Sequence, residues 1–159
     1  MSRKRKRRFI RVLSCGAVPF YESDDGSLEF LIIQHHAGHW GFPKGRRERG
    51  ENYEETAKRE VEEEVGQRGK FLTKLPIESR FPIRNGNKRV VWFLSKFSHQ
   101  NVRITNELRA WKWGSFQKIC KCLTHDQDRR VLREALNYIE RNNQPQINKE
   151  EGKIEERVV

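Results

Sequence analysis

The chain has 159 residues, of which 35% are hydrophobic, so it is long enough for one domain with a core and too short for two. Its 33 lysines and arginines against 22 aspartates and glutamates give a formal net charge of +11, which favours a phosphate-rich partner. The sequence contains no apolar run of the roughly 20 residues that cross a bilayer, and its basic start lacks the apolar segment of a secretory signal. We therefore expect a cytoplasmic protein without a membrane segment.

The two ends of the chain differ in composition from the middle. Residues 3–8 are six consecutive lysines or arginines, so residues 1–8 are expected to form a disordered basic arm. This arm could contact RNA or another polyanion, or it could serve only solubility. Residues 142–159 are polar and charged, and we expect a mobile tail there. The domain is therefore predicted to span residues 9–141, and we expect a monomer.

Two strands are predicted before the first helix. Residues 9–21 alternate between apolar and polar and then become continuously apolar, as in a strand that enters a buried sheet. Residues 22–27 have the composition of a turn, and residues 28–34 predict a second strand. Residues 35–45 are rich in histidine, glycine and proline, and we expect them to form a loop without regular structure.

Residues 52–66 predict a helix with one apolar side and one acidic side. The apolar side is formed by residues that recur every four positions: Tyr53, Ala57, Val61 and Val65. On the other side, the three carboxylates at 60, 63 and 64 lie on neighbouring turns, where they repel one another unless a cation lies between them. Carboxylate oxygens suit Mg²⁺ or Mn²⁺. The alternative is an ordinary solvated acidic helix.

The spacing around this helix resembles the signature of the Nudix hydrolases. The matching positions are Gly45, Glu51, Arg59, Glu60, Glu63, Glu64 and Gly66. The resemblance implies an α/β fold in which a curved mixed sheet lies between helices, as an α/β/α sandwich. It also implies Mg²⁺ bound by the three glutamates of the helix, with Arg59 orienting these carboxylates. Gln67 departs from the pattern, because an aliphatic residue usually follows the final glycine.

The segment before the helix adds a second resemblance. His39, Trp40, Pro43 and Lys44 are similar to a segment of Nudix enzymes that act on dinucleoside polyphosphates and of those that act on RNA 5′ ends. The resemblance implies that His39 and Lys44 contact substrate, with the Lys44 ammonium against a phosphate. The alternative for Lys44 is a surface lysine.

A hairpin is predicted after the helix, with strands over residues 70–75 and 89–98. Residues 84–87 are predicted to form the turn, since their central Asn-Gly pair is a strong hairpin signal. Phe81 and Lys88 flank this turn. These positions are similar to those at which asymmetric diadenosine tetraphosphate hydrolases place an aromatic ring against a base and a lysine against phosphate. For Phe81 the alternative is an ordinary core residue.

The last part of the domain contributes two further candidates. The resemblance implies that Glu107 supplies an additional metal ligand or assists the attacking water; otherwise it is a surface charge. Trp111 and Trp113 alternate in the strand that follows and are expected to share one buried face. Helices are predicted over residues 116–122 and 128–141. Between them, His125 occupies a position where related enzymes often place a Tyr or Phe that sandwiches a base.

These patterns favour a metal-dependent hydrolase of a phosphoanhydride. The leading hypothesis is hydrolysis of a dinucleoside polyphosphate, with diadenosine tetraphosphate giving ATP and AMP. The alternative is an RNA 5′-end pyrophosphohydrolase or decapping-type enzyme, supported by the Trp-Gly-Phe-Pro-Lys-Gly segment and the basic arm. A third hypothesis is a binding protein that retains the fold without catalysis.

Overall fold

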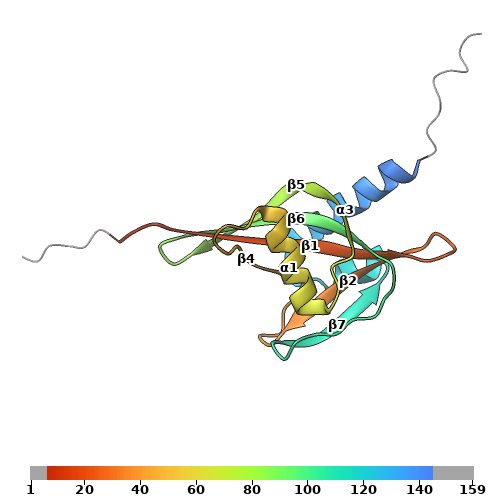
Figure 1. Ribbon diagram of the computed structural model, residues 1–159, viewed down its shortest axis with the longest axis horizontal. Coiled ribbons are helices and arrows are strands. Elements are labelled where there is room, and N and C mark those ends of the chain that lie inside the picture. The colour runs from red at the N-terminus through yellow and green to blue at the C-terminus, as the bar shows by residue number, and fades with distance from the viewer. Residues whose placement is uncertain (1–6, 145–159) are drawn as a thin grey trace, which may run out of the picture.

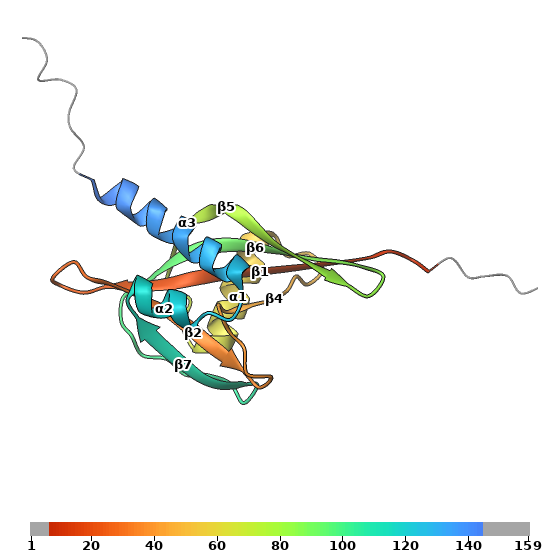
Figure 2. The same ribbon diagram turned by 180° about the vertical axis from the view of Figure 1, so that it is seen from behind.

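A seven-stranded sheet lies between helices on both of its faces (Figures 1 and 2). The computed structural model describes residues 7–144. The strands are β1 (Ile10–Glu22), β2 (Leu28–His35), β3 (Trp40–Gly41), β4 (Lys44–Arg46), β5 (Lys70–Ile83), β6 (Gly86–Phe97) and β7 (Leu108–Gly114). The helices are α1 (Tyr53–Val65), α2 (Phe116–Cys122) and α3 (Asp126–Asn143). Helix α1 lies in front of the sheet in Figure 1, whereas α2 and α3 lie in front in Figure 2, which confirms the predicted α/β/α arrangement.

Strand β1 is the centre of the sheet. It pairs in parallel with β6 from Ile10 to Tyr21, and antiparallel with β2 and β4. Beyond these neighbours, β5 pairs with β6, while β3 and β7 pair with β2, all antiparallel. The sheet is therefore mixed, as expected.

The two faces of the sheet bury separate cores. Successive side chains of a strand point to opposite faces, so β1 contributes to both. Val18 and Phe20 pack with residues of α2 and α3, whereas Cys15 and Ala17 pack with residues of α1. Since each helix covers its own core, the two faces can carry different sites.

Helix α1 begins and ends as its sequence predicts. The Asn52 side chain accepts a hydrogen bond from the Glu55 N–H, and the Glu55 carboxylate accepts one from the Asn52 N–H, which together form a capping box. At the other end Gly66 adopts φ = 85°, a left-handed conformation that favours glycine. Ala57, Val61 and Val65 are fully buried against the sheet.

The region predicted as an irregular loop, residues 35–45, contains regular structure. Trp40 and Gly41 form β3, and Lys44 begins β4, which pairs with β1. These strands of two and three residues are too short for their composition to reveal, because each is held by pairing with a strand far along the chain rather than by local propensity.

The strands of the β5–β6 hairpin are longer than predicted, and its turn is shorter, because Gly86 and Asn87 belong to β6. Arg84 and Asn85 form the turn, with Asn85 at φ = 61°, and Ile83 pairs with Gly86. A side chain on Gly86 would collide with the backbone of Ile10, so glycine is needed where the hairpin meets β1.

Two further differences concern the C-terminal half of the domain. Trp111 is 46% exposed rather than part of the core, while Trp113 is partly buried as expected. Helix α3 begins at Asp126, two residues before its predicted start, and continues to Asn143. The predicted arm and tail lie, apart from the residues next to the domain, outside the described residues.

Over residues 7–144, no helix is both long enough and apolar enough to span a membrane.

Candidate active site

Arg59 holds together the acidic residues of the helix and the loop before it. Its guanidinium donates two hydrogen bonds to the Glu51 carboxylate, at 2.8 and 2.9 Å, and one to Glu60 Oε1, at 2.9 Å. It also lies 3.3 Å from Glu63 Oε2 and donates to the Arg46 carbonyl at 3.0 Å. Hydrogen bonds from Arg59 lower the pKa of Glu51 to about 2. These contacts orient three carboxylates at once, the role expected for Arg59.

Strand β4 brings the backbone directly against two of the glutamates. The Lys44 N–H donates a hydrogen bond to Glu64 Oε2 at 3.1 Å. Gly45 lies against the Glu60 carboxylate, and a side chain at Gly45 would occupy the same space. The glycine of the motif is therefore required by the close approach of Glu60, even though its backbone conformation is ordinary.

The two inner glutamates are electrostatically strained. Burial, with the nearby Glu60 charge as the second cause, raises the pKa of Glu64 to about 8. Burial also raises the pKa of Glu60, although Arg59 opposes this shift. Glu63 differs, since its side chain is 57% exposed. Positive charge placed beside Glu60 and Glu64 would therefore stabilise their ionised forms.

Glu107 joins these glutamates in one open pocket of about 490 Å³, which we call the carboxylate pocket. Glu107 is exposed and approaches from the loop before β7, and its charge contributes to the raised pKa of Glu64. Two neighbouring loop residues, which the sequence did not single out, complete the lining. The carboxylate pocket is lined by Glu60, Glu63, Glu64, Thr105, Asn106 and Glu107.

The donor set of the carboxylate pocket fits a hard divalent cation. Within residues 7–144, no three carboxylate, imidazole or thiol groups are close enough to enclose an ion by themselves. Arg59 is one reason for the absence of such a group, because it donates hydrogen bonds to carboxylate oxygens of Glu60 and Glu63. Mg²⁺ usually binds one or two carboxylates and completes its shell with water and substrate phosphate, so an open set of oxygen donors suits it. Glu60, Glu64 and Glu107 would hold such an ion, with Glu63 at the rim.

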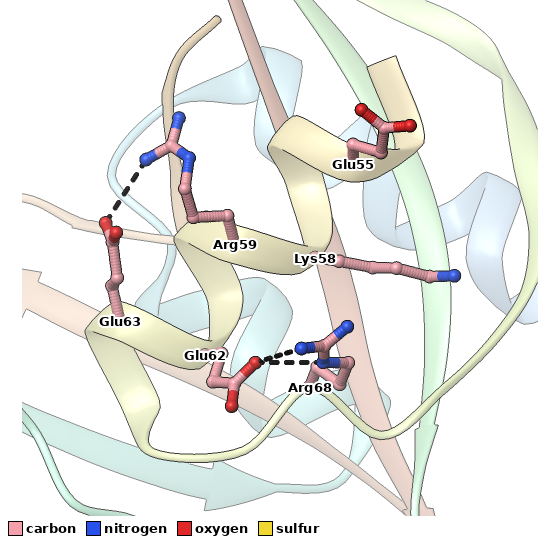
Figure 3. A pocket seen from close by; sticks show the side chains of 6 residues that line it. All are labelled: Glu55, Lys58, Arg59, Glu62, Glu63 and Arg68. Atoms are coloured by element: carbon pink, nitrogen blue, oxygen red, sulfur yellow. Dashed lines mark hydrogen bonds and ion pairs between the residues drawn. The ribbon is translucent and has the colours of Figure 1, made fainter. Parts of the chain in front are cut away.

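A larger pocket, of about 540 Å³, lies on the outward side of α1 (Figure 3). In this pocket Arg68 forms an ion pair with Glu62, and Arg59 points to Glu63. Three acidic and three basic side chains line the pocket, so it offers no excess charge to a ligand. Glu62 and Lys58 belong to this outward side and are useful as controls for the inner residues.

The five residues predicted to bind substrate line a single cavity on the other face of the sheet. This cavity has a volume of about 170 Å³, and we call it the ring cavity. Its lining combines aromatic and imidazole rings with two lysines. The residues are His35, His39, Gly41, Phe42, Lys44, Phe81, Lys88, His125 and Asp128. Residues that are far apart in the sequence, from β2 to α3, therefore converge here.

The rings in this cavity touch one another. Phe81 and His125 are 6.2 Å apart between ring centroids and meet edge to face at 65°. A base sandwiched between two parallel rings needs roughly 7 Å between them, twice a stacking contact of about 3.5 Å. A sandwich between Phe81 and His125 therefore requires at least one ring to turn. His35 and His39 are stacked at 4.3 Å, and His125 lies 5.9 Å from His39.

The lysines of the ring cavity are placed to meet an anion. Lys44 Nζ lies 5.4 Å from the centre of the Phe81 ring and 5.9 Å from that of Trp92, which are cation–π distances. Burial lowers the pKa of Lys88, and the nearby positive charge of Lys44 lowers it further. Among residues 7–144, no acidic side chain lies within ion-pair distance of either ammonium group, so the two lysines would bind a phosphate that passes between them.

His35 and Asp128 were not among the predicted site residues, although both line the ring cavity. Burial, with the charge of His39 as the second cause, lowers the pKa of His35 to about 4, so its ring is neutral at pH 7. Asp128 is only 4% exposed, although it is charged in water. No pattern in the sequence marks either residue, because a histidine at a strand end and an aspartate in the first turn of a helix are both common.

Gln67, the departure from the motif, has a structural role away from these pockets. Its side-chain amide donates to the carbonyls of His99 and Asn101, at 3.1 and 2.8 Å. It therefore holds the loop that follows β6 rather than filling an apolar gap, and it contacts neither the carboxylate pocket nor the ring cavity.

The chain is similar to known proteins over almost the whole described region. Residues 11–136 match the family model of the NUDIX domain. The mouse asymmetrical bis(5′-nucleosyl)-tetraphosphatase is 30% identical over 138 residues, which cover 79% of this chain and 94% of that protein. The protein of the same name from Caenorhabditis elegans is 28% identical and covers 80% of this chain and 97% of its own length.

Solved structures share the fold. The binary complex of the C. elegans Ap4A hydrolase superposes with a TM-score of 0.72 at 24% identity, over 81% of this chain and 98% of that one. The NUDIX domain of Shewanella oneidensis NrtR in complex with ADP ribose gives a TM-score of 0.70 at 20% identity, over 82% and 89% of the two chains. The motif, the fold and the match over residues 11–136 agree, and the chain belongs to the Nudix family.

Proposed function

We propose that the protein hydrolyses a phosphoanhydride bond of a dinucleoside polyphosphate, as a monomer in the cytoplasm, with Mg²⁺ or Mn²⁺ as the cofactor. Diadenosine tetraphosphate would give ATP and AMP. The relatives named for tetraphosphatase activity support this substrate class. The observation that carries the proposal is the position of Lys44, whose N–H binds Glu64 while its side chain lines the ring cavity. One substrate could thus place its base in the ring cavity and its phosphates at the carboxylate pocket.

Each part of the site has a separate task. Lys44 and Lys88 bind phosphoryl oxygens and offset the negative charge that grows on them during attack. A bound divalent cation would polarise a phosphate oxygen and lower the pKa of a water molecule. Glu64 is held at Oε2 by the Lys44 N–H, so its Oε1 is the atom that accepts a proton from the attacking water. Arg59 keeps Glu60 and Glu63 in position.

The test compares two substrates at matched concentration with the products identified by chromatography: diadenosine tetraphosphate and a short 5′-triphosphorylated RNA. We expect hydrolysis of the dinucleotide to ATP and AMP, abolished by EDTA and reduced about a thousandfold by Glu64→Gln. A hundredfold preference in kcat/KM corresponds to about 2.7 kcal/mol of transition-state binding. An unchanged rate of turnover in Glu64→Gln, or turnover without divalent cations, would overturn the mechanism. A hundredfold preference for RNA would overturn the substrate class.

The RNA 5′ end remains the second candidate, because basic residues continue from the ring cavity along the sheet. Lys88 also lines a pocket of about 170 Å³ with Arg11, Arg80 and Arg89, beside the described start of the chain. Such a surface matches a polynucleotide backbone. Under this alternative, removal of residues 1–8 reduces turnover of RNA and leaves a dinucleotide nearly unaffected. An equal loss for both substrates would assign residues 1–8 a role in folding instead.

A further inference from the structure

Asp128 is a buried carboxyl group, and one of its oxygens has no hydrogen-bond partner in the part of the chain that the structure describes. It is 4% exposed, and its Oδ1 accepts no hydrogen bond from any group in residues 7–144. It lies in the first turn of α3, and its side chain lines the ring cavity. A buried carboxyl group that is left without hydrogen bonds costs free energy, so its place beside a cavity points to a ligand that supplies the donors.

The size of the ring cavity sets what that ligand can be. Its volume of about 170 Å³ is below the roughly 300 Å³ at which pockets begin to enclose a drug-sized molecule. It can therefore take one flat part of a nucleotide rather than a whole one. The stacked rings of His35 and His39, with Phe81 and His125, give it aromatic walls suited to a base.

The polar atoms of the cavity favour one kind of base edge. A carboxylate only accepts hydrogen bonds, so it pairs best with two adjacent N–H donors. Guanine offers such a pair at N1 and N2, whereas adenine offers a donor at N6 next to an acceptor at N1. His35 Nε2 is also buried without a partner in the described region, and a neutral imidazole can donate one hydrogen bond. The carbonyl oxygen of guanine, beside N1, is an acceptor for it.

We infer that Asp128 determines base specificity in the ring cavity and that it selects guanine over adenine in the bound end of the substrate. The inference rests on the proposed function, because it assumes that a nucleotide enters this cavity.

A simpler role for Asp128 is to balance the positive charges of the cavity. Burial raises the pKa of Asp128, whereas Lys44, His125 and Arg129 favour its ionised form and oppose this shift. However, no lysine or arginine nitrogen of the described chain lies within 4.0 Å of its carboxylate. Charge balance would affect all bases equally, whereas hydrogen bonding to a base edge affects their ratio, so the two roles are separable.

The first measurement uses the unmodified protein and three dinucleoside tetraphosphates that contain guanosine, inosine or adenosine. Inosine keeps N1–H but lacks the 2-amino group. We expect kcat/KM to be at least tenfold higher for the guanosine compound than for the other two, because only guanine presents both donors. Equal values for the three compounds, or a preference for adenosine, would overturn the inference without any variant.

The second measurement compares Asp128→Asn with Asp126→Asn. Asparagine has one acceptor and one donor, which match the N6 and N1 positions of adenine, so Asp128→Asn should lower the guanosine-to-adenosine ratio at least tenfold. Asp126 lies at the same helix end but has an 85% exposed side chain, so its variant should keep the ratio of the unmodified protein. If kcat/KM fell by the same factor for the guanosine and adenosine compounds in Asp128→Asn, the role of Asp128 would be charge balance and the inference would be overturned.

Binding in EDTA, measured by calorimetry with the same dinucleotides, separates this inference from the proposed function. Selective binding of guanosine compounds, without hydrolysis in Mg²⁺, would refute the proposed hydrolase activity and support the specificity of the ring cavity for guanine. Hydrolysis without base selectivity would support the hydrolase activity and refute the specificity for guanine. Thermal denaturation of both variants verifies that each is folded at the assay temperature.

Discussion

The carboxylate pocket and the ring cavity lie on opposite faces of one sheet and follow different physical rules. The carboxylate pocket is open, acidic and held by charged contacts through Arg59. The ring cavity is small and walled by rings, with two lysines and with Asp128, whose Oδ1 has no hydrogen-bond partner within residues 7–144. The first has the groups for chemistry on phosphate and the second has the groups for recognition of a base. Strand β4 joins them, since Lys44 contributes to both.

Because the two regions have different tasks, we expect substitutions in them to change different kinetic constants. A change in the carboxylate pocket should lower kcat for every substrate, because the reacting phosphate is common to them all. A change in the ring cavity should alter KM and depend on the base. Lys44, which belongs to both regions, should affect both constants.

Glu64→Gln should have the largest effect, a fall in kcat of about a thousandfold, within the range for loss of a group that moves a proton. The glutamine keeps the hydrogen bond from the Lys44 N–H but cannot accept the proton. Steady-state kinetics with diadenosine tetraphosphate measure the fall. Glu62→Gln is the control, because Glu62 points outward from the same helix towards Arg68 (Figure 3). Equal losses in the two variants would contradict a special role for Glu64.

Lys44→Met should lower kcat/KM by about a hundredfold, since one donor to a developing charge is worth roughly 10²–10³ in rate. Methionine has an unbranched side chain one atom shorter than lysine, so it removes the ammonium group and keeps most of the apolar stem. The same change at Lys58, on the outward side of α1, should have little effect. Values of kcat and KM that both stay within twofold in Lys44→Met would contradict a role for Lys44 in either the carboxylate pocket or the ring cavity.

Arg59→Met should lower kcat by roughly 10–100-fold, with a smaller change in KM, because Arg59 acts through the carboxylates it orients. Stability against pH gives an independent readout. The pKa of Glu51 is lowered to about 2, so its stabilising contribution is complete above its unfolded pKa of about 4.3 and is lost as pH falls towards 2. The fall in Tm over this range should be smaller in Arg59→Met than in the unmodified protein. An identical fall in Tm in both proteins would show that the contact between Arg59 and Glu51 does not contribute to the dependence of stability on pH.

His125→Ala should have the smallest effect, about a fivefold rise in KM, at the low end of the roughly 1–3 kcal/mol measured for base stacking on an aromatic ring. His125 is exposed, and its ring touches Phe81 by an edge rather than by a face. His99→Ala, in the loop held by Gln67, is the matched control. A larger effect on kcat than on KM would place His125 among the groups of the carboxylate pocket instead.

The sequence predicted what depends on short-range spacing. Helix α1 is correct because its caps, its apolar side and its acidic side are all encoded within fifteen consecutive residues. The fold class is correct because the motif within this helix identifies a family. The missed strand β4 has three residues, and its structure comes from pairing with β1.

Asp128 and His35, the residues of the ring cavity that the sequence did not single out, were missed for a different reason. Asp128 has the sequence context of a residue that favours the start of a helix, and only its burial beside Gly41 distinguishes it. His35 is similar, since it ends a strand and becomes notable through its stack with His39. Trp111 shows the opposite error. Alternation correctly predicts which face it shares, but it cannot predict whether another element covers that face.

The parallel pairing of β1 with β6 has a consequence for how the protein is made. Residues 23–85 lie between these strands, so β1 leaves the ribosome long before its longest partner exists. Until β6 arrives, the apolar stretch from Cys15 to Phe20 has an open edge, and the loop that must close is long. Nascent chains of this protein should therefore be more prone to aggregate, and more dependent on chaperones, than the finished domain.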